Sequence, residues 1–169
     1  MYLKTMNDED RVKLNQRYER IKSLQAQDIC FGWYNFDSGD IFPDDGLIFY
    51  EDDLIRCQFE KYPRVNGQTI IVTREHYEDM SEMPLELGTY ILSVIDKLIK
   101  LHKEILKAEK VYMCTICDGK RNHLHFQLFP RFKTDTIGYG NFVKPEGVLT
   151  DYQETVKLFK GRLEKMMVE

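Results

Sequence analysis

The most informative segment of the chain runs from residue 122 to residue 131 and reads Asn122-His123-Leu124-His125-Phe126-Gln127-Leu128-Phe129-Pro130-Arg131. Its alternation of polar and apolar residues predicts a β-strand over residues 123–129, because successive side chains of a strand point to opposite faces. One face then presents three nitrogen-bearing side chains about 6.8 Å apart, twice the rise per residue: His123, His125 and Gln127. Packing gives no reason for this polar row, since burying it without partners would be costly. The row therefore indicates a functional site rather than an ordinary exposed strand face.

Two kinds of chemistry suit a row of two histidines and a glutamine. In the first, the middle imidazole is an unprotonated nucleophile, and its neighbours orient the phosphate that it attacks. In the second, the two histidines bind zinc, which needs a third and a fourth ligand. His76 and Cys30 are the candidates for those ligands. The sequence alone does not place either of them near the strand.

The rest of the chain indicates a single domain that works in the cytoplasm. Its 169 residues suffice for a sizeable core, and 43% of them are hydrophobic. The net charge of −4 argues against general nucleic-acid binding, which requires a basic surface. Residues 1–10 lack the apolar segment of a signal peptide, and no run approaches the roughly 20 apolar residues of a membrane span. The four cysteines are too sparse for a disulfide framework and are expected to be reduced.

Apolar spacing along the chain predicts an α+β domain with a mainly antiparallel sheet. Helical periodicity predicts helices over residues 8–25, 84–107 and 151–166. Short apolar runs between turn residues predict strands over residues 47–50, 54–59, 68–73 and 111–116, before the strand at 123–129. Residues 30–45 are rich in aromatic residues, Gly and Asp, and they are predicted to form a long loop.

The sequence resembles the histidine triad (HIT) superfamily, whose signature alternates three histidines with apolar residues and often continues into Pro-Arg. Here the signature is residues 123–129, with Gln127 in the third position, followed by Pro130-Arg131. A second similarity lies in the Gly-containing turn and strand of residues 63–76, and the Glu51-Asp52-Asp53 turn also resembles the family. The resemblance covers roughly residues 30–131. It implies a HIT-like core with a meandering antiparallel sheet of about five strands and one long helix packed on it. The helices predicted over residues 8–25 and 151–166 lie outside the resemblance and extend this core at both ends, within one domain over residues 1–169.

The resemblance also implies roles for individual residues. His125 would be the nucleophile that forms a covalent nucleotidyl-histidine at the α-phosphate, and His123 would support and orient it. Glu60 falls near the family's acidic residue that binds ribose hydroxyls. The apolar side chains of Ile55 and Cys57 would form walls of the pocket that holds the base.

Gln127 is the main departure from three histidines, and the transferases of the superfamily share it: the galactose-1-phosphate uridylyltransferases and the diadenosine tetraphosphate phosphorylases. The amide would donate a hydrogen bond to a phosphate oxygen, but it cannot transfer a proton. Leaving groups that are stable as anions, such as phosphates, are therefore favoured over amines. Hydrolysis is not excluded, because water can resolve the intermediate.

Other candidate substrate residues lie in turns. Gln68 replaces the histidine that usually follows the family's turn glycine. The Gly-rich segment that precedes the triad in the family is missing, and Lys120 and Arg121 stand in its place. These two residues would contact phosphates as charges, or else they are solvated turn residues. His76 would contact the substrate, or else it caps the backbone at the end of its strand.

Zinc-binding relatives contain Cys-x-x-Cys, a downstream histidine and the first histidine of the triad. Here Trp33 stands at the second cysteine position after Cys30, so Cys30, His76 and His123 offer at most three ligands. We therefore expect no structural zinc and no required cofactor. Mg²⁺ would enter only together with a polyphosphate substrate.

These observations indicate an enzyme that processes nucleotides by double displacement. His125 would attack the α-phosphate of a dinucleoside polyphosphate or a nucleoside diphosphate derivative, and phosphate or water would then take the nucleotidyl group. One alternative is a hydrolase of dinucleoside polyphosphates or phosphoramidates, and another is a nucleotide-binding module without catalysis. The expected partner is a small nucleotide, not a nucleic acid or a membrane. Because family members commonly dimerise through the long helix and an adjoining strand, the resemblance implies a homodimer.

Overall fold

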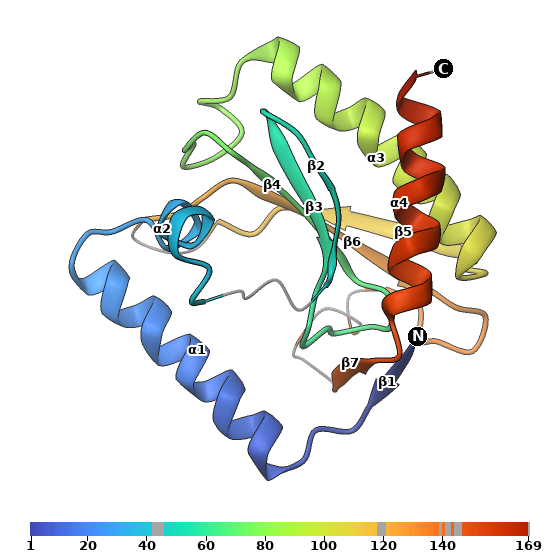
Figure 1. Cartoon of the computed structure of the whole chain (residues 1–169), viewed down its shortest axis with the longest axis horizontal. Coiled ribbons are helices and arrows are strands. Elements are labelled where there is room, and N and C mark those ends of the chain that lie inside the picture. The colour runs from blue at the N-terminus through green and yellow to red at the C-terminus, as the bar shows by residue number, and fades with distance from the viewer. Residues whose placement is uncertain (42–45, 118–120, 139, 141–142, 144–146, 169) are drawn as a thin grey trace.

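A computed structural model describes residues 1–41, 46–117, 121–138, 140, 143 and 147–168. A five-stranded antiparallel sheet lies at the centre of this part of the chain, with helices on both of its faces (Figure 1). The predicted α+β class is therefore confirmed, as is the long helix packed on a five-stranded sheet.

The sheet has the strand order β2-β3-β4-β6-β5 and is antiparallel throughout. Its strands in chain order are β2 (Ile48–Glu51), β3 (Ile55–Phe59), β4 (Thr69–Thr73), β5 (Lys110–Cys114) and β6 (His125–Arg131). The register of β6 places His125 opposite Val72 of β4, and Gln127 opposite both Ile70 of β4 and Cys114 of β5. The last strand of the sheet in sequence thus lies between two earlier strands.

One face of the sheet packs against helix α3 (Leu85–Ile105) and forms the apolar core. The buried apolar residues of α3 recur every three or four positions and form one stripe: Leu87, Ile91, Val94, Ile95, Leu98 and Leu101. Helix α4 (Gln153–Val168) packs beside α3. It places the fully buried Phe159 against Phe49 and Phe59, with ring centroids 5.4 and 4.9 Å away. The C-terminal helix is therefore part of the core.

Two N-terminal helices, α1 (Asp8–Ala26) and α2 (Phe31–Ser38), lie on the opposite side of the sheet (Figure 1). Because residues 31–38 are helical, the predicted loop over residues 30–45 is wrong there. The Sγ of Cys30 caps the start of α2 by accepting a hydrogen bond from the backbone N–H of Trp33, and Gly39 ends the helix at φ 67°. An eight-residue helix is too short to show a clear apolar periodicity, which explains the error.

Strand β6 begins at His125 rather than at the predicted His123, and it continues through Pro130 to Arg131. The ladder with β4 reaches only to the pair of Val72 with His125. Beyond it, the N–H of Leu124 donates to the carbonyl oxygen of Tyr77 at 2.8 Å. His123 therefore lies just before the strand, so the alternation of side-chain directions along β6 does not determine where its ring points.

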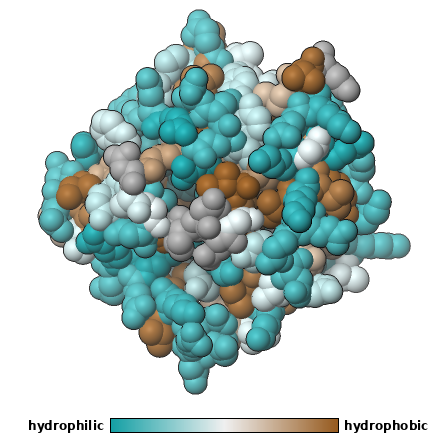
Figure 2. Space-filling model, viewed as in Figure 1, coloured by the Kyte–Doolittle hydropathy of each residue, from teal (hydrophilic) through white to brown (hydrophobic). Residues whose placement is uncertain are grey.

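A further short sheet pairs β1 (Tyr2–Lys4) with β7 (Val148–Thr150) and brings the first residues of the chain beside the segment that leads into α4. Most of the surface in Figure 2 is hydrophilic, in keeping with the 31% of charged residues. Among the described helices, none combines the length and the apolar character that a membrane crossing requires.

Candidate active site

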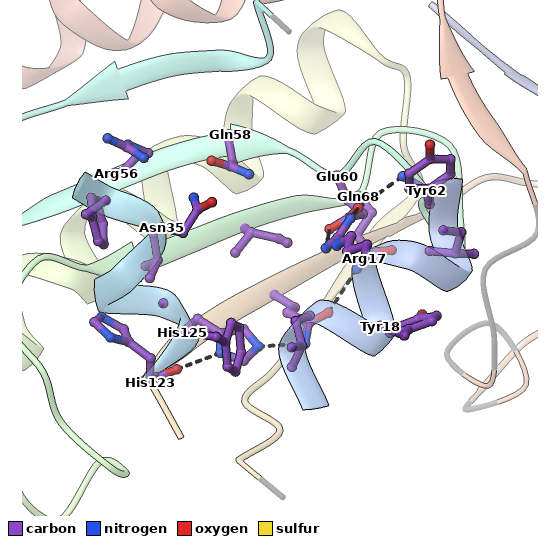
Figure 3. A pocket seen from close by; sticks show the side chains of 18 of the residues that line it. Arg17, Tyr18, Asn35, Arg56, Gln58, Glu60, Tyr62, Gln68, His123 and His125 are labelled. Carbon is purple, nitrogen blue, oxygen red and sulfur yellow. Dashed lines mark hydrogen bonds and ion pairs between the residues drawn. The ribbon is translucent and has the colours of Figure 1, made fainter. Parts of the chain in front are cut away.

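A cavity of about 230 Å³ lies between the sheet and helices α1 and α2 (Figure 3). Residues at or next to β3, β4 and β6 line it with polar groups: Arg56, Gln58, Glu60, Arg64, Gln68, His123, His125 and Gln127. The two helices line it mainly with apolar side chains: Leu14, Tyr18, Ile21, Phe31 and Phe36. The cavity thus contains the whole predicted row of two histidines and a glutamine, together with Glu60.

The ring of His125 is held between two hydrogen bonds. Its Nδ1–H donates to the carbonyl oxygen of His123 at 2.9 Å, and its Nε2 accepts from the side-chain amide of Gln127 at 3.1 Å. A carbonyl oxygen can only accept, so the proton of the neutral ring is on Nδ1, and Nε2 is unprotonated, with its lone pair toward the Gln127 amide. Burial lowers the pKa of His125, which keeps the ring neutral at neutral pH. An unprotonated nitrogen at a cavity has the form that a nucleophile requires.

Two buried glutamines connect this nitrogen to the backbone elsewhere in the cavity. The Oε1 of Gln127 accepts a hydrogen bond from Nε2 of Gln68 at 2.9 Å. The Oε1 of Gln68 in turn accepts from the backbone N–H of Arg64 at 2.7 Å. Because a backbone N–H can only donate, every donor in this series of hydrogen bonds points from Arg64 toward His125. The N–H at one end and the carbonyl group of His123 at the other require the same arrangement of protons.

Beside the cavity, three side chains from separate parts of the chain meet: Cys30, His76 and His123. The Sγ of Cys30 is 3.2 Å from the Nδ1 atom of each histidine. The Nε2 of His123 is 2.6 Å from the carbonyl oxygen of Thr73, and the Nε2 of His76 is 3.2 Å from the carboxylate of Glu78. Both Nε2 atoms therefore donate to acceptors, and both Nδ1 lone pairs face one thiol, which has a single proton to share.

This group of three fits a zinc ion in kind, because thiolate and imidazole are usual zinc ligands and both imidazoles have outer hydrogen-bond partners. The ligand atoms all lie within 4.8 Å of one another. The group is one protein ligand short of a structural zinc site, which uses four. Trp33 stacks on the ring of His76 instead, with centroids 6.2 Å apart and an interplanar angle of 16°. The sequence offered these same three residues as candidate ligands, but it did not predict that they meet.

Helix α2 lies very close to this group. A Cβ atom on Gly32 would be only 2.6 Å from Cβ and Cγ of His123, so no other residue fits there without displacing the histidine. The Sγ of Cys30 also caps the helix. The same thiol therefore positions α2 and contacts both histidines.

Glu60 lies in the cavity directly after β3. Its carboxylate forms two hydrogen bonds with Arg17 of α1, at 2.7 and 3.2 Å, and accepts a third from the N–H of Tyr62 at 3.0 Å. Burial would raise the pKa of Glu60, but the charge and the hydrogen bonds of Arg17 outweigh burial and keep the pKa below its usual value. The carboxylate at the predicted ribose position is therefore ionised and paired with Arg17.

The prediction that Ile55 and Cys57 line the base is wrong for this cavity. Both side chains are fully buried in the core on the α3 side of the sheet. Their neighbours Arg56 and Gln58 face the cavity instead. Because side chains alternate along a strand, residues 55 and 57 lie on the face opposite to residues 56 and 58.

Arg121 and His76, two further predicted substrate residues, do not line the cavity. The guanidinium group of Arg121 is 3.7 Å from Glu78 and 3.8 Å from Asp28. His76 belongs to the group with Cys30, described above. Lys120 lies outside the described residues.

Sequence reasoning missed the contribution of α1, which lines the cavity with Leu14, Arg17, Tyr18 and Ile21. Their spacing of three or four residues indicates one helix face, but it does not say what that face covers. The contact of Gln68 with Gln127 was also missed, because it joins residues 59 positions apart through the register of β4 with β6.

The sheet order, the long helix and the His-x-His-x-Gln row, which begins just before the central strand β6, are the features of a histidine triad protein. It belongs to the HIT domain family, whose model matches residues 44–134, more than half of the chain. The match begins after helices α1 and α2 and ends before α4.

Similar proteins include two uncharacterized HIT-like proteins of archaea. One, from Saccharolobus solfataricus, is 27% identical over 118 residues, which cover 68% of this chain and 85% of that protein. The other, from Methanocaldococcus jannaschii, is 28% identical over 120 residues, which cover 68% of this chain and 88% of that protein.

Solved structures with the same fold include two from other organisms. A Zn-bound histidine triad family protein from Mycobacterium smegmatis superposes with a TM-score of 0.62 at 18% identity, covering 82% of this chain and 96% of that one. The diadenosine triphosphate hydrolase of Plasmodium falciparum superposes with a TM-score of 0.57 at 12% identity, covering 72% of this chain and 79% of that one. At these identities the likeness concerns the fold alone.

Proposed function

We propose that this HIT-family protein is an enzyme that transfers a nucleotidyl group through a covalent intermediate on His125. The observation that supports the proposal is the state of the His125 ring: neutral, with Nδ1–H bound to the backbone and an Nε2 lone pair at the cavity. Such a ring is oriented for attack before any substrate arrives, which lowers the entropic cost of the reaction.

The reaction has two displacement steps. First, Nε2 of His125 attacks the α-phosphorus, so that an N–P bond forms while the P–O bond to the leaving group breaks and its electrons leave with that oxygen. The positive charge that develops on the ring is stabilised by the carbonyl oxygen of His123, which stays bound to Nδ1–H. Second, an oxygen of phosphate or water attacks the phosphorus, and the N–P electrons return to Nε2; when water attacks, one of its protons passes to the solvent.

Gln127 would turn its amide from Nε2 of His125 to a phosphate oxygen when substrate binds. It can donate this hydrogen bond but cannot protonate the leaving group. The proposed substrates are therefore dinucleoside polyphosphates or nucleoside diphosphate derivatives, whose leaving groups are stable anions. Hydrolysis of dinucleoside polyphosphates or phosphoramidates is the alternative outcome at the same site, and nucleotide binding without chemistry is the second alternative.

The charges of the cavity support an anionic substrate. Among the described residues, the guanidinium groups of Arg17, Arg56 and Arg64 line it; Arg17 is paired with Glu60 and Arg56 with Glu51, which leaves an excess of one positive charge. This local excess of positive charge contrasts with the net charge of −4 of the whole chain. Guanidinium groups bind phosphates with paired hydrogen bonds. The apolar side chains of α1 and α2 offer a surface on which a base would pack.

A zinc ion held by Cys30, His76 and His123 would supply structural cross-linking between α2 and the residues that precede β6, and the proposed chemistry does not depend on it. We further propose that the protein acts in the cytoplasm as a homodimer, as other members of the family do, and that Mg²⁺ takes part only as the companion of a polyphosphate.

The test is to trap the intermediate. Protein incubated with diadenosine tetraphosphate labelled at the α-phosphorus and quenched in acid-free denaturant should retain label, and His125→Ala should retain none. Turnover should fall on the order of 10⁴-fold or more in His125→Ala. Gln58→Asn, which alters another side chain of the same cavity, serves as the matched control.

The products separate the alternatives. Phosphate-dependent release of ADP supports transfer to phosphate, whereas release of AMP at the same rate without phosphate supports hydrolysis. If tight nucleotide binding persists while no label or product is ever found, the binding module replaces the enzyme.

A further inference from the structure

Gln68 occupies a rigid position next to the proposed reaction centre. It directly precedes β4 and follows Gly67, whose φ of 80° forms the turn. Its backbone N–H donates to the carbonyl oxygen of Val65 at 3.1 Å, and its carbonyl oxygen accepts from the N–H of Glu60 at 2.9 Å. The residue is only 3% exposed. Both its backbone and its side chain are therefore held in place.

The side chain of Gln68 has one favourable orientation. Its Oε1 must face the backbone N–H of Arg64, which can only donate, so its Nε2 must face Gln127. If the Gln68 amide turned over, its NH₂ would meet the N–H of Arg64 and its oxygen would meet Oε1 of Gln127. Both contacts would then be repulsive in a buried place, where unpaired polar groups are costly.

The orientation of Gln68 determines that of Gln127. With Nε2 of Gln68 on its Oε1, Gln127 presents its NH₂ group to Nε2 of His125. Without Gln68, the Gln127 amide would be free to present its oxygen. An oxygen there would favour a proton on Nε2 of His125 and would repel the oxygens of a phosphate.

We propose that Gln68 is a positioning residue that holds the amide of Gln127 with its NH₂ group toward His125 and toward the phosphate to be transferred. The effect on transfer rests on the proposed function, whereas the effect on the proton of His125 does not. The backbone N–H of Arg64 thus orients the neutral side chain of Gln68, and Gln68 orients the neutral amide of Gln127 that would bind the phosphoryl group.

The decisive experiment measures the His125 tautomer in the protein without substrate, by long-range ¹H–¹⁵N NMR of the histidine side chains. The unmodified protein should show a proton on Nδ1 and none on Nε2. In Gln68→Glu, both carboxylate oxygens accept, so Gln127 should turn its NH₂ to the new carboxylate and its oxygen to His125. His125 should then acquire a proton on Nε2.

Gln58→Glu is the matched control, because it adds the same charge to the same cavity at a residue that has no hydrogen bond to Gln127. The proposal is overturned if His125 keeps its Nδ1–H tautomer in Gln68→Glu, or if Gln58→Glu changes the tautomer equally. In the second case the charge, and not the orientation of Gln127, is responsible.

Gln68→Met removes both hydrogen bonds at similar volume and serves if the carboxylate variant fails to fold. A mixture of His125 tautomers is expected, and a single Nδ1–H form contradicts the proposal. For turnover, kcat should fall roughly ten- to hundredfold, the equivalent of a lost buried hydrogen bond, while KM changes less than about threefold. A protein without any turnover would refute the proposed function and still leave the NMR result to decide on Gln68.

Discussion

The ion pair of Arg17 with Glu60 attaches helix α1 to the sheet, and its removal should measurably destabilise the protein. The two side chains are only 16% and 8% exposed, and the guanidinium group binds both carboxylate oxygens. At an effective dielectric constant of about 20, charges about 4 Å apart attract each other by about 4 kcal/mol. Loss of one partner of a buried pair costs about 3–5 kcal/mol, because the other charge stays buried without compensation. Because water partly reaches the pair, we expect Arg17→Met to lower the free energy of unfolding by about 3 kcal/mol.

The double variant separates the lost attraction from the stranded charge. In Arg17→Met with Glu60→Gln, no buried charge remains, so stability should return to within about 1 kcal/mol of the unmodified protein. The two single substitutions should therefore show a coupling of about 2 kcal/mol or more. Lys100→Met is the control, because its pair with Asp96 is 61% exposed on each side and should contribute less than about 0.5 kcal/mol.

Urea unfolding followed by circular dichroism measures these differences as shifts in midpoint at unchanged slope. The effect should also depend on pH. Since pairing lowers the folded pKa of Glu60 below the ordinary value of 4.5, its stabilisation is fully present above pH 4.5 and is lost as pH falls through the folded pKa. Arg17→Met and the unmodified protein should then converge. A loss no larger than that of Lys100→Met at pH 7, or a double variant as unstable as Arg17→Met, would refute the reasoning.

Three further predictions concern the site and the core. Because burial lowers the pKa of His125, the acid limb of the pH–rate profile of nucleotidyl transfer should have its midpoint below the ordinary histidine value of 6.5, and a midpoint above 6.5 contradicts this. Added zinc should bind with release of the Cys30 proton, and Cys30→Ser should weaken zinc binding at least about tenfold. Competition with a chelator measures the zinc affinity of each protein, and the fluorescence of the single tryptophan, Trp33, gives a second signal. Equal zinc affinities of Cys30→Ser and the unmodified protein would count against the site. Phe159→Ala should destabilise the protein by about 3–5 kcal/mol in urea unfolding, and a loss under about 1 kcal/mol would mean that α4 is not part of the cooperative core.

The parts of the fold that depend on local periodicity could be predicted from the sequence. The apolar stripe of α3 and the alternation along β6 give a helix and a strand with known inner faces, since a side chain's direction follows from its position in a regular element. The row of His123, His125 and Gln127 was found in the same way. Even the shifted start of β6 leaves all three at one cavity.

The error on β3 shows how sensitive strands are to register. Residues 55, 57 and 60 cannot all face one side of a strand, because the side-chain period is two. Glu60 lines the cavity, so Ile55 and Cys57 had to lie on the other face. A check of parity along the strand would have exchanged them for Arg56 and Gln58.

The contacts that complete the site could not be predicted, because they join elements that are distant in sequence. Arg17 meets Glu60 across 43 positions, and Cys30 meets His123 across 93. Such pairs depend on where α1 and α2 pack, and no periodicity within either helix contains that information. Helix α2 itself was missed, since its ends are capped by a thiol and a glycine that resemble loop residues.

The two backbone groups that hold the proton of His125 have a consequence for the design and the search of such sites. The N–H of Arg64 and the carbonyl group of His123 belong to peptide bonds, which neither titrate over the physiological range nor change when a side chain is substituted. In a His-x-His-x-Gln motif transplanted to a strand of another protein, the orientation of the glutamine amide and the position of the histidine proton would therefore not be fixed. They would be fixed only if that protein also had a backbone donor and a backbone acceptor at the two ends of the hydrogen-bond chain. Matches to the motif gain meaning when the two peptide groups are required along with the three side chains.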